Sequence, residues 1–209
     1  MTPILLKRKA FTLCFIILPA MLYAQISETQ FPDRTRNILW HTPCGASRIN
    51  GLAIGFQAAR FGLGTLTIRG VNADLGMVAA FGTPYIVASS FFSKKKRERF
   101  LFVHPDSAST IIYGVSISYG GEAGVEMHGI NIAGGITIAS KLYGLSLTGI
   151  YSQSYEFRGV CIGGLNNNAI KGTGLQIGLF NSCKQLKGVQ VGLWNKSGKR
   201  GLPFINWGT

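Results

Sequence analysis

The residues that could act as general bases near neutral pH are few: His41, His104 and His128. None of them stands at the spacing of a zinc-binding motif such as HExxH. His104 opens the stretch His-Pro-Asp-Ser, which contains the residue types of a catalytic triad. Because triad members come from distant segments of a chain, we interpret residues 104–107 as a turn begun by proline.

Glu122 and Glu126 are the carboxylates that could act as a pair on a glycosidic bond. Glu122 lies in a glycine-rich segment, residues 120–124, that has neither the lysine nor the following helix of a phosphate-binding loop. We interpret both glutamates as polar loop residues. The sequence predicts a protein that is not an enzyme, with no catalytic, cofactor-binding or metal site; an envelope hydrolase using Glu122 or His128 is the weakest alternative.

A repeat of about 15 residues must position these groups, since it organises the second half of the chain. Each unit opens with a glycine followed by alternating apolar residues, and the spacings between units are 15, 15, 15, 15 and 14: Gly114, Gly129, Gly144, Gly159, Gly174 and Gly188. Gly51 and Gly70 open weaker copies, and a degenerate unit begins at Gly201. Alternation with period two predicts β-strands, and glycine suits a bulge or corner because it reaches positive φ without steric cost.

The two faces of each strand differ in polarity. In the unit Leu186–Asn195, apolar residues at positions 189, 191 and 193 alternate with Gln190 and Gly192. We expect the apolar positions to face the interior, so Ile177 is assigned to the core and Gln176 to the solvent. Asparagines recur at the far end of the strand, where they can hold a turn: Asn166, Asn181 and Asn195.

Two all-β architectures fit this repeat. In a β-solenoid-like stack of ~15-residue units, each unit is one coil and equivalent residues form parallel ladders. In an outer-membrane antiparallel β-barrel, each unit is one strand and its turn. A barrel meander would alternate short and long connections, whereas the period here is uniform. The sequence therefore favours the solenoid, with Val160, Leu175 and Val189 in one row.

The organisation along the chain follows from composition. Residues 1–24 are expected to be a signal peptide, because a basic start (Lys7, Arg8 and Lys9) precedes an apolar run too short to span a bilayer. An entry segment (25–47), an irregular β region (48–110) with a basic loop (94–99), tandem β repeats (111–200) and a C-terminal cap (201–209) complete the chain. We expect export to the outer membrane or cell surface, with the periplasm as the alternative.

Charge points to the surfaces the protein could meet. The chain carries 21 basic and 8 acidic residues, a formal charge of +13, at a charged fraction too low and a hydrophobic fraction too high (46%) for a disordered chain. The candidate contacts with an anionic surface are the basic residues of the loop: Lys94, Lys95, Lys96, Arg97 and Arg99. Seven further basic residues follow Glu156 and are interpreted as solvated turn residues. The partner is left open among envelope glycans, lipopolysaccharide and other surface proteins; no nucleic acid is expected, and membrane association is left open.

Three cysteines follow the expected signal peptide: Cys44, Cys161 and Cys183. Their number allows at most one disulfide, and no CxxC spacing suggests a metal site. We interpret Cys161 and Cys183 as small packing residues, and whether any two of the three are bridged stays open.

Two units, GLQIGLFN (174–181) and GVQVGLWN (188–195), closed by LPFINW (202–207), resemble a bacterial surface-repeat family. Its members carry a signal peptide and tandem units of this kind. The resemblance runs over residues 112–207 and, more weakly, 48–76; the units opened by Gly129 and Gly144 lack the terminal asparagine. It implies a Gram-negative cell-envelope protein and brings no activity, ligand or catalytic residue. We therefore expect a non-enzymatic structural or interaction scaffold, with an outer-membrane barrel of structural or pore role as the alternative.

Overall fold

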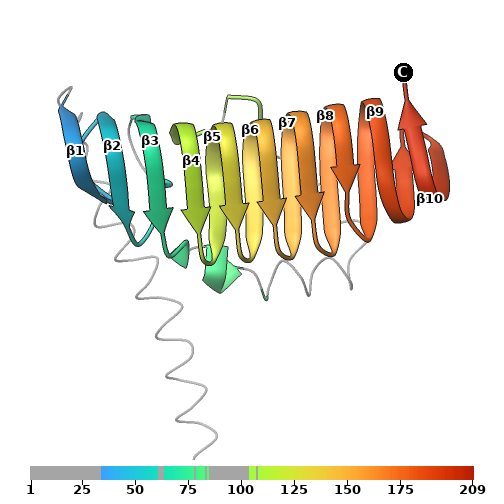
Figure 1. The fold of residues 1–209 in the computed structure, drawn as a ribbon, viewed down its shortest axis with the longest axis horizontal. Coiled ribbons are helices and arrows are strands. Elements are labelled where there is room, and N and C mark those ends of the chain that lie inside the picture. The colour runs from blue at the N-terminus through green and yellow to red at the C-terminus, as the bar shows by residue number, and fades with distance from the viewer. Residues whose placement is uncertain (1–33, 61–63, 78, 83, 85–103, 107) are drawn as a thin grey trace, which may run out of the picture.

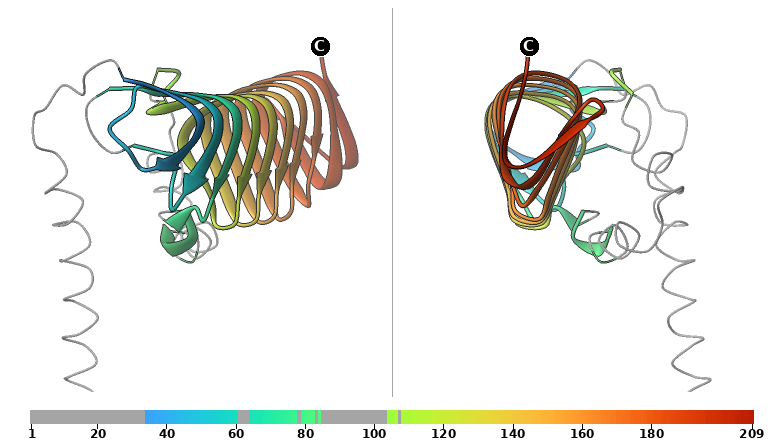
Figure 2. Two further views of the ribbon diagram at one scale, coloured as in Figure 1. Left: turned by 60° about the vertical axis from the view of Figure 1, so that its left-hand side comes forward. Right: turned by 90° about the vertical axis from the view of Figure 1, so that its right-hand side faces the viewer.

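The protein is a β-solenoid in which the chain winds in coils of about 15 residues (Figures 1 and 2). The computed structural model describes residues 34–60, 64–77, 79–82, 84, 104–106 and 108–209. Viewed along the stack, successive coils superpose (Figure 2). The expected signal peptide (1–24) and the basic loop (94–99) lie outside the described residues.

Ten strands form one sheet in chain order. Their bounds are β1 Thr35–Thr42, β2 Arg48–Gly55, β3 Leu66–Asp74, β4 Thr110–Ser118, β5 Gly121–Ala133, β6 Ile136–Thr148, β7 Tyr151–Gly163, β8 Asn166–Ile177, β9 Phe180–Ser197 and β10 Arg200–Gly208. A short helical segment follows β3 within residues 77–84. Strand β1 therefore falls in the expected entry segment, and β2 and β3 are regular strands of the region expected to be irregular.

Neighbouring strands from β1 to β9 pair in parallel, which confirms the solenoid and excludes the antiparallel barrel. Val160 is in register with Leu175, and Leu175 with Val189, as the uniform period predicts. Only β10 departs from the pattern among the described strands, because it runs antiparallel to β9.

The glycines that open the repeats form a continuous column through β2–β9, which we call the glycine column: Gly51, Gly70, Gly114, Gly129, Gly144, Gly159, Gly174 and Gly188. Gly159 has a φ of 121°, and a Cβ there would lie 2.2 Å from the carbonyl oxygen of Gly144. No side chain fits between coils at this point, so the column fixes the spacing and register of the stack. The weaker copies at Gly51 and Gly70 are confirmed, and the units lacking the terminal asparagine stack in the same register.

The assignment of faces after the glycine column was wrong. Gln176 and Gln190 are fully buried inside the coil, whereas Val189 and Val191 are exposed. Cys161 of β7 occupies one of the seven positions of this interior row from β3 to β9, and buried polar residues occupy the other six: Asn72, Ser116, Asn131, Ser146, Gln176 and Gln190. They are tolerated because they bond one another across coils, as when the Asn131 amide donates to Ser146 Oγ at 3.1 Å.

An apolar core fills the other half of the coil interior. It is built by the strand residues that precede the glycine column, and includes Ile112, Met127, Leu142, Phe157 and Leu186. At the corner beyond the polar row, the Asn181 amide donates to Gly178 O at 3.0 Å and to Asn195 Oδ1 at 2.7 Å. The predicted role of the asparagines in holding turns is thus visible at Asn181.

Strand β10 closes the C-terminal end of the stack by a different route from the one expected. Phe204 and Trp207 are exposed, so they do not cover the last coil. Instead Asn206 is fully buried, and its amide donates to Gln190 Oε1 and to Asn195 O. Pro203 lies at a bulge where the pairing with β9 shifts register. The cap is therefore a polar plug on the interior ladder.

The three described cysteines are free thiols: Cys44, Cys161 and Cys183. Burial raises the pKa of Cys161 and raises that of Cys183 to about 12. Both are therefore unreactive packing residues, as the sequence suggested. In the described part of the chain, no helix is long and apolar enough to cross a membrane.

Candidate functional site

Two rows of outward-facing side chains run along the strands just before the glycine column, and together we call them the polar face. The row next to the glycines contains Tyr113, His128, Tyr143, Arg158, Thr173 and Lys187. The row two residues earlier contains Glu126, Lys141, Glu156, Lys171 and Gln185. Because the register is uniform, residues far apart in sequence become neighbours one coil apart.

Glu126 is the centre of a charged cluster on the polar face. Its carboxylate lies 2.8 Å from His128 Nε2 and 3.0 Å from Lys141 Nζ. Burial opposes ionisation of Glu126, but the hydrogen bonds with His128 and Lys141 outweigh it and hold its pKa below the usual value. The same bond raises the pKa of Lys141. With its oxygens engaged in this way, Glu126 is an ionised structural anchor.

Rings stack along the row next to the glycines. Tyr113 stacks on His128 with centroids 4.6 Å apart, and Tyr143 meets the other side of the imidazole edge-on at 5.1 Å. The Arg158 guanidinium lies 5.1 Å from the centroid of Tyr143 and donates to Glu156 at 2.7 Å. Burial first, and then the Glu156 charge, raise the pKa of Tyr143, so its hydroxyl stays protonated. This half of the polar face is aromatic and its charges are paired.

The C-terminal end of the polar face opens into a groove of about 790 Å³, which we call the basic groove. Its cationic side chains are Lys171, Lys184, Lys187, Lys199 and Arg200, and Glu156 is the one acidic side chain that lines it within the described part of the chain. That carboxylate is already engaged by Arg158. The groove therefore carries a strong excess of positive charge, and a concave cationic surface attracts anions.

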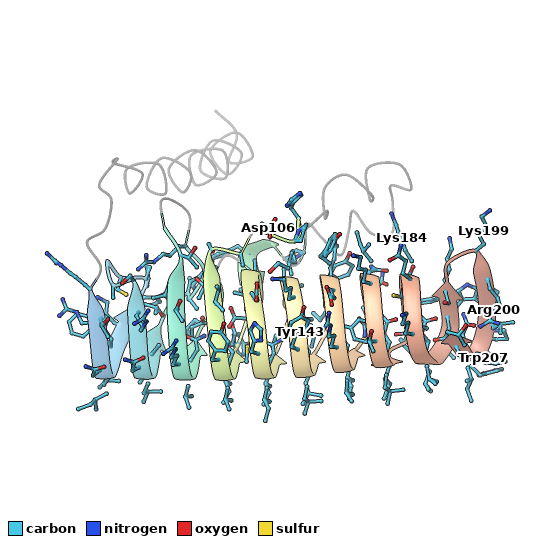
Figure 3. The ribbon with its side chains drawn as sticks, turned by 90° about the horizontal axis from the view of Figure 1, so that it is seen from above. Asp106, Tyr143, Lys184, Lys199, Arg200 and Trp207 are labelled. Atoms are coloured by element: carbon cyan, nitrogen blue, oxygen red, sulfur yellow. The ribbon has the colours of Figure 1, made fainter. Side chains whose placement is uncertain are left out.

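Arg200 and Trp207 form the end wall of the basic groove. The Arg200 guanidinium lies 4.7 Å from the Trp207 ring centroid, and its Nε donates to Asn206 Oδ1 at 3.0 Å. Arg200 also donates to the carbonyl oxygen of Trp207. In Figure 3, Lys184 and Lys199 project on the same side of the stack, with Arg200 and Trp207 at the last strand. The buried plug residue Asn206 thus orients a cation and, through it, an indole.

The structure separates the residues singled out for catalysis. Glu122 is buried inside the coil, whereas Glu126 lies on the outer surface, so the two carboxylates do not flank a common site. His104 and Asp106 are exposed, with Nδ1 and Oδ2 3.9 Å apart, in a turn as interpreted. His41 stacks on Trp40 at 5.3 Å. The basic loop residues proposed to contact an anionic surface lie outside the described residues.

Glu122 belongs to the interior polar row. Its carboxyl accepts hydrogen bonds from Ser116 Oγ and, at 3.2 Å, from the Asn72 amide. Burial and then the neighbouring charge of Asp74 raise its pKa to about 8. Asp74 itself accepts from Ser118 at 2.6 Å and from the Ala58 N–H at 2.8 Å. Glu122 is therefore a protonated interior residue at neutral pH, shielded from any substrate.

In the described ranges, no group of three or more His, Cys, Asp or Glu residues is placed to hold a metal ion. No protein-family model matches the chain, and no match was found among curated proteins or solved structures. The function has to be argued from the surface itself.

The basic groove was missed at the level of sequence, where its lysines were interpreted as solvated turn residues. The sequence did contain part of the information needed to predict the groove, because Thr173 and Lys187 are one repeat apart and so share a row. The rest depends on the reversal at residues 198–199 that turns β10 back along β9, which no repeat period encodes.

Proposed function

We propose that the protein is a non-enzymatic scaffold of the bacterial cell envelope that binds anionic glycans in the basic groove. The single observation that carries this proposal is the concentration of Lys171, Lys184, Lys187, Lys199 and Arg200 around one concave surface. The expected signal peptide and the resemblance of the repeats to a bacterial surface-repeat family support the location.

The groove chemistry favours a sugar polymer over a small inorganic anion. Trp207 is half-exposed beside the cations, and an indole offers a flat apolar surface with one polar N–H. Thr173, Gln185 and Ser197 add hydroxyl and amide groups to the lining. Carboxylate or phosphate groups on a chain of sugars would meet the lysines, while hydroxyls and ring faces would meet the remaining lining.

The rest of the solenoid suits a scaffold role. Coils locked by the glycine column form a rigid rod, and the charges of the aromatic half of the polar face are already paired with one another. A rigid rod with a charged groove at one end presents its ligand at a fixed distance from the other end of the described chain. No catalytic step is needed for such a role.

The proposal is tested by titrating the purified protein with polygalacturonate, and with dextran as the uncharged polymer. The triple variant K171Q/K187Q/K199Q removes cations from the groove. The matched control R34Q/R48Q/R69Q removes the same number of exposed cations from β3 and the N-terminal coils. We expect the groove variant to bind polygalacturonate at least tenfold more weakly than the control, and neither to bind dextran.

Equal weakening in both variants would mean that net charge, and no particular site, holds the polymer, which would overturn the proposal. Tighter binding of a DNA oligonucleotide than of polygalacturonate, measured at the same salt concentration, would also overturn it. Both affinities are measured at one salt concentration because charge-driven affinity falls steeply as salt rises.

A further inference from the structure

We propose that a second surface of the solenoid, which lies across the glycine column from the polar face and which we call the apolar face, pairs with a second copy of this chain. This face consists of the outward side chains one and three residues after the glycine column, continued on β10. The first row is Leu52, Val71, Val115, Ile130, Leu145, Val160, Leu175 and Val189; the second is Ile54, Ala73, Ile117, Ile132, Leu147, Ile162, Ile177, Val191 and Ile205.

Every position in both rows is apolar, and the side chains face outward. Ile54, Ile117 and Ile132 are 48%, 47% and 39% exposed. The interior of the same strands is taken by the polar ladder, so these residues have no core of their own to join. Leu179 and Leu193 follow two residues after the second row and are exposed as well.

The extent of the apolar face matches a small specific interface. Strands spaced by about 4.8 Å make the rows from β2 to β10 about 40 Å long. Each row covers the length of two residues along the strand, about 6.6 Å, so the two rows together are about 13 Å wide. Each copy then offers about 500 Å², and a pair buries about 1,000 Å², where specific interfaces begin. A continuous apolar patch of this size is as large as the largest patch on a typical monomer, and such patches often mark an interaction site.

A second copy fits this surface better than an unrelated partner because the face is regular and self-complementary. Rows with identical spacing on both copies can interdigitate as two packed sheets do. A two-fold axis in the plane of the interface and parallel to the strands would run the stacks in opposite directions, so β6, the middle strand of β2–β10, meets β6. This orientation also keeps the two cationic C-terminal ends, with Lys184, Lys199 and Arg200, far apart.

The first test measures mass in solution by analytical ultracentrifugation over a concentration series. We expect the parent protein to sediment at twice the mass of one chain, and to do so at high salt too. Ile117→Lys/Ile132→Lys should sediment as a monomer whose unfolding midpoint equals that of the parent diluted until it is monomeric, because long side chains at exposed sites can reach solvent and only the stabilisation by association is lost. Thr173→Lys, on the polar face, is the matched control and should remain dimeric.

The second test locates the contact with a short bismaleimide cross-linker in a Cys44→Ser background, since Cys161 and Cys183 are buried. Leu147→Cys, near the proposed axis, should cross-link two chains. Ile54→Cys and Thr173→Cys should not, because the first lies at opposite ends of the two copies and the second on another face. A monomeric parent, a dimer untouched by the lysine variants, or a monomer that binds phosphatidylcholine vesicles through this face would each overturn the proposal.

Discussion

The Gln190 side-chain amide donates a hydrogen bond to Gln176 Oε1 at 2.8 Å, and both residues are fully buried. Residues one coil apart thus satisfy each other inside the solenoid. This contact is one hydrogen bond of the polar ladder, by which we mean the interior row of buried polar side chains from Asn72 to the plug residue Asn206. This interior row tolerates polar side chains because they pair with side chains of neighbouring coils, as in Asn72 with Ser116 and Asn131 with Ser146.

Gln176→Lys should therefore lower the free energy of unfolding by about 3 kcal/mol or more, since it buries a charge beside an unpaired amide. Ile177→Lys, one residue away on the apolar face, should cost less than about 1 kcal/mol. Chemical denaturation of the two variants measures the difference. Equal costs, or a larger cost at Ile177, would contradict the observed orientation of the strand.

Gly159→Ala should prevent folding or unfold the stack locally. The added Cβ would lie 2.2 Å from Gly144 O at a φ of 121°. Gly124→Ala is the control: its φ is also positive, at 72°, but its nearest atom is Ser109 Oγ at 3.5 Å. The control should be destabilised only by the backbone strain of an alanine at positive φ, about 1–2 kcal/mol. Thermal unfolding compares them, and similar midpoints would show that the column does not set the coil spacing.

The raised pKa of Glu122 makes stability fall as pH rises. The folded protein retains this proton up to about pH 8, whereas the unfolded chain releases it near 4.5. Its contribution to stability is thus full below pH 4.5, declines between 4.5 and 8, and does not change further above 8.

Glu122→Gln should flatten this decline and raise the unfolding midpoint most at pH 8, because the amide stays neutral and its oxygen can accept from Ser116 and Asn72. Thermal scans at pH 5, 6.5 and 8 provide the comparison. A variant whose midpoint declines as steeply as that of the parent would assign the pH dependence to other groups.

The plug makes a prediction about the C-terminal strand. Asn206→Ala should cost about 1–3 kcal/mol, because it leaves Gln190 Oε1 and Asn195 O with one donor fewer inside the coil. Phe204→Gly should be neutral or slightly stabilising, since Phe204 is exposed and has a φ of 64°. Deletion of residues 201–209 should cause aggregation or loss of folding. If the protein without residues 201–209 has the same unfolding midpoint as the parent, the plug does not stabilise the end of the stack.

The period of the glycines predicted the parallel stack. Each coil must place a glycine against the glycine of the preceding coil, because no side chain fits at Gly159 or Gly174, and so the glycines recur once per coil. The strand alternation predicted two faces but not which one is interior. The expectation that apolar side chains face the interior places Ile177 inside. It failed because Gln176 and its neighbours in the ladder form the hydrogen bonds that buried polar groups require. The basic groove could be foreseen only in its Thr173–Lys187 and Lys171–Gln185 rows, since Arg200 and Trp207 reach it through the reversal into β10.

Trp207 offers the most direct measurement of the central claim, that anionic glycans bind in the basic groove. The chain has three tryptophans, so Trp40→Phe/Trp194→Phe leaves Trp207 as the sole indole emitter. Titration with polygalacturonate should change its emission saturably, with no change on adding dextran and at least a tenfold weaker response when K171Q/K187Q/K199Q is added. Binding of the polymer with no change in Trp207 emission would place the ligand elsewhere and contradict the account.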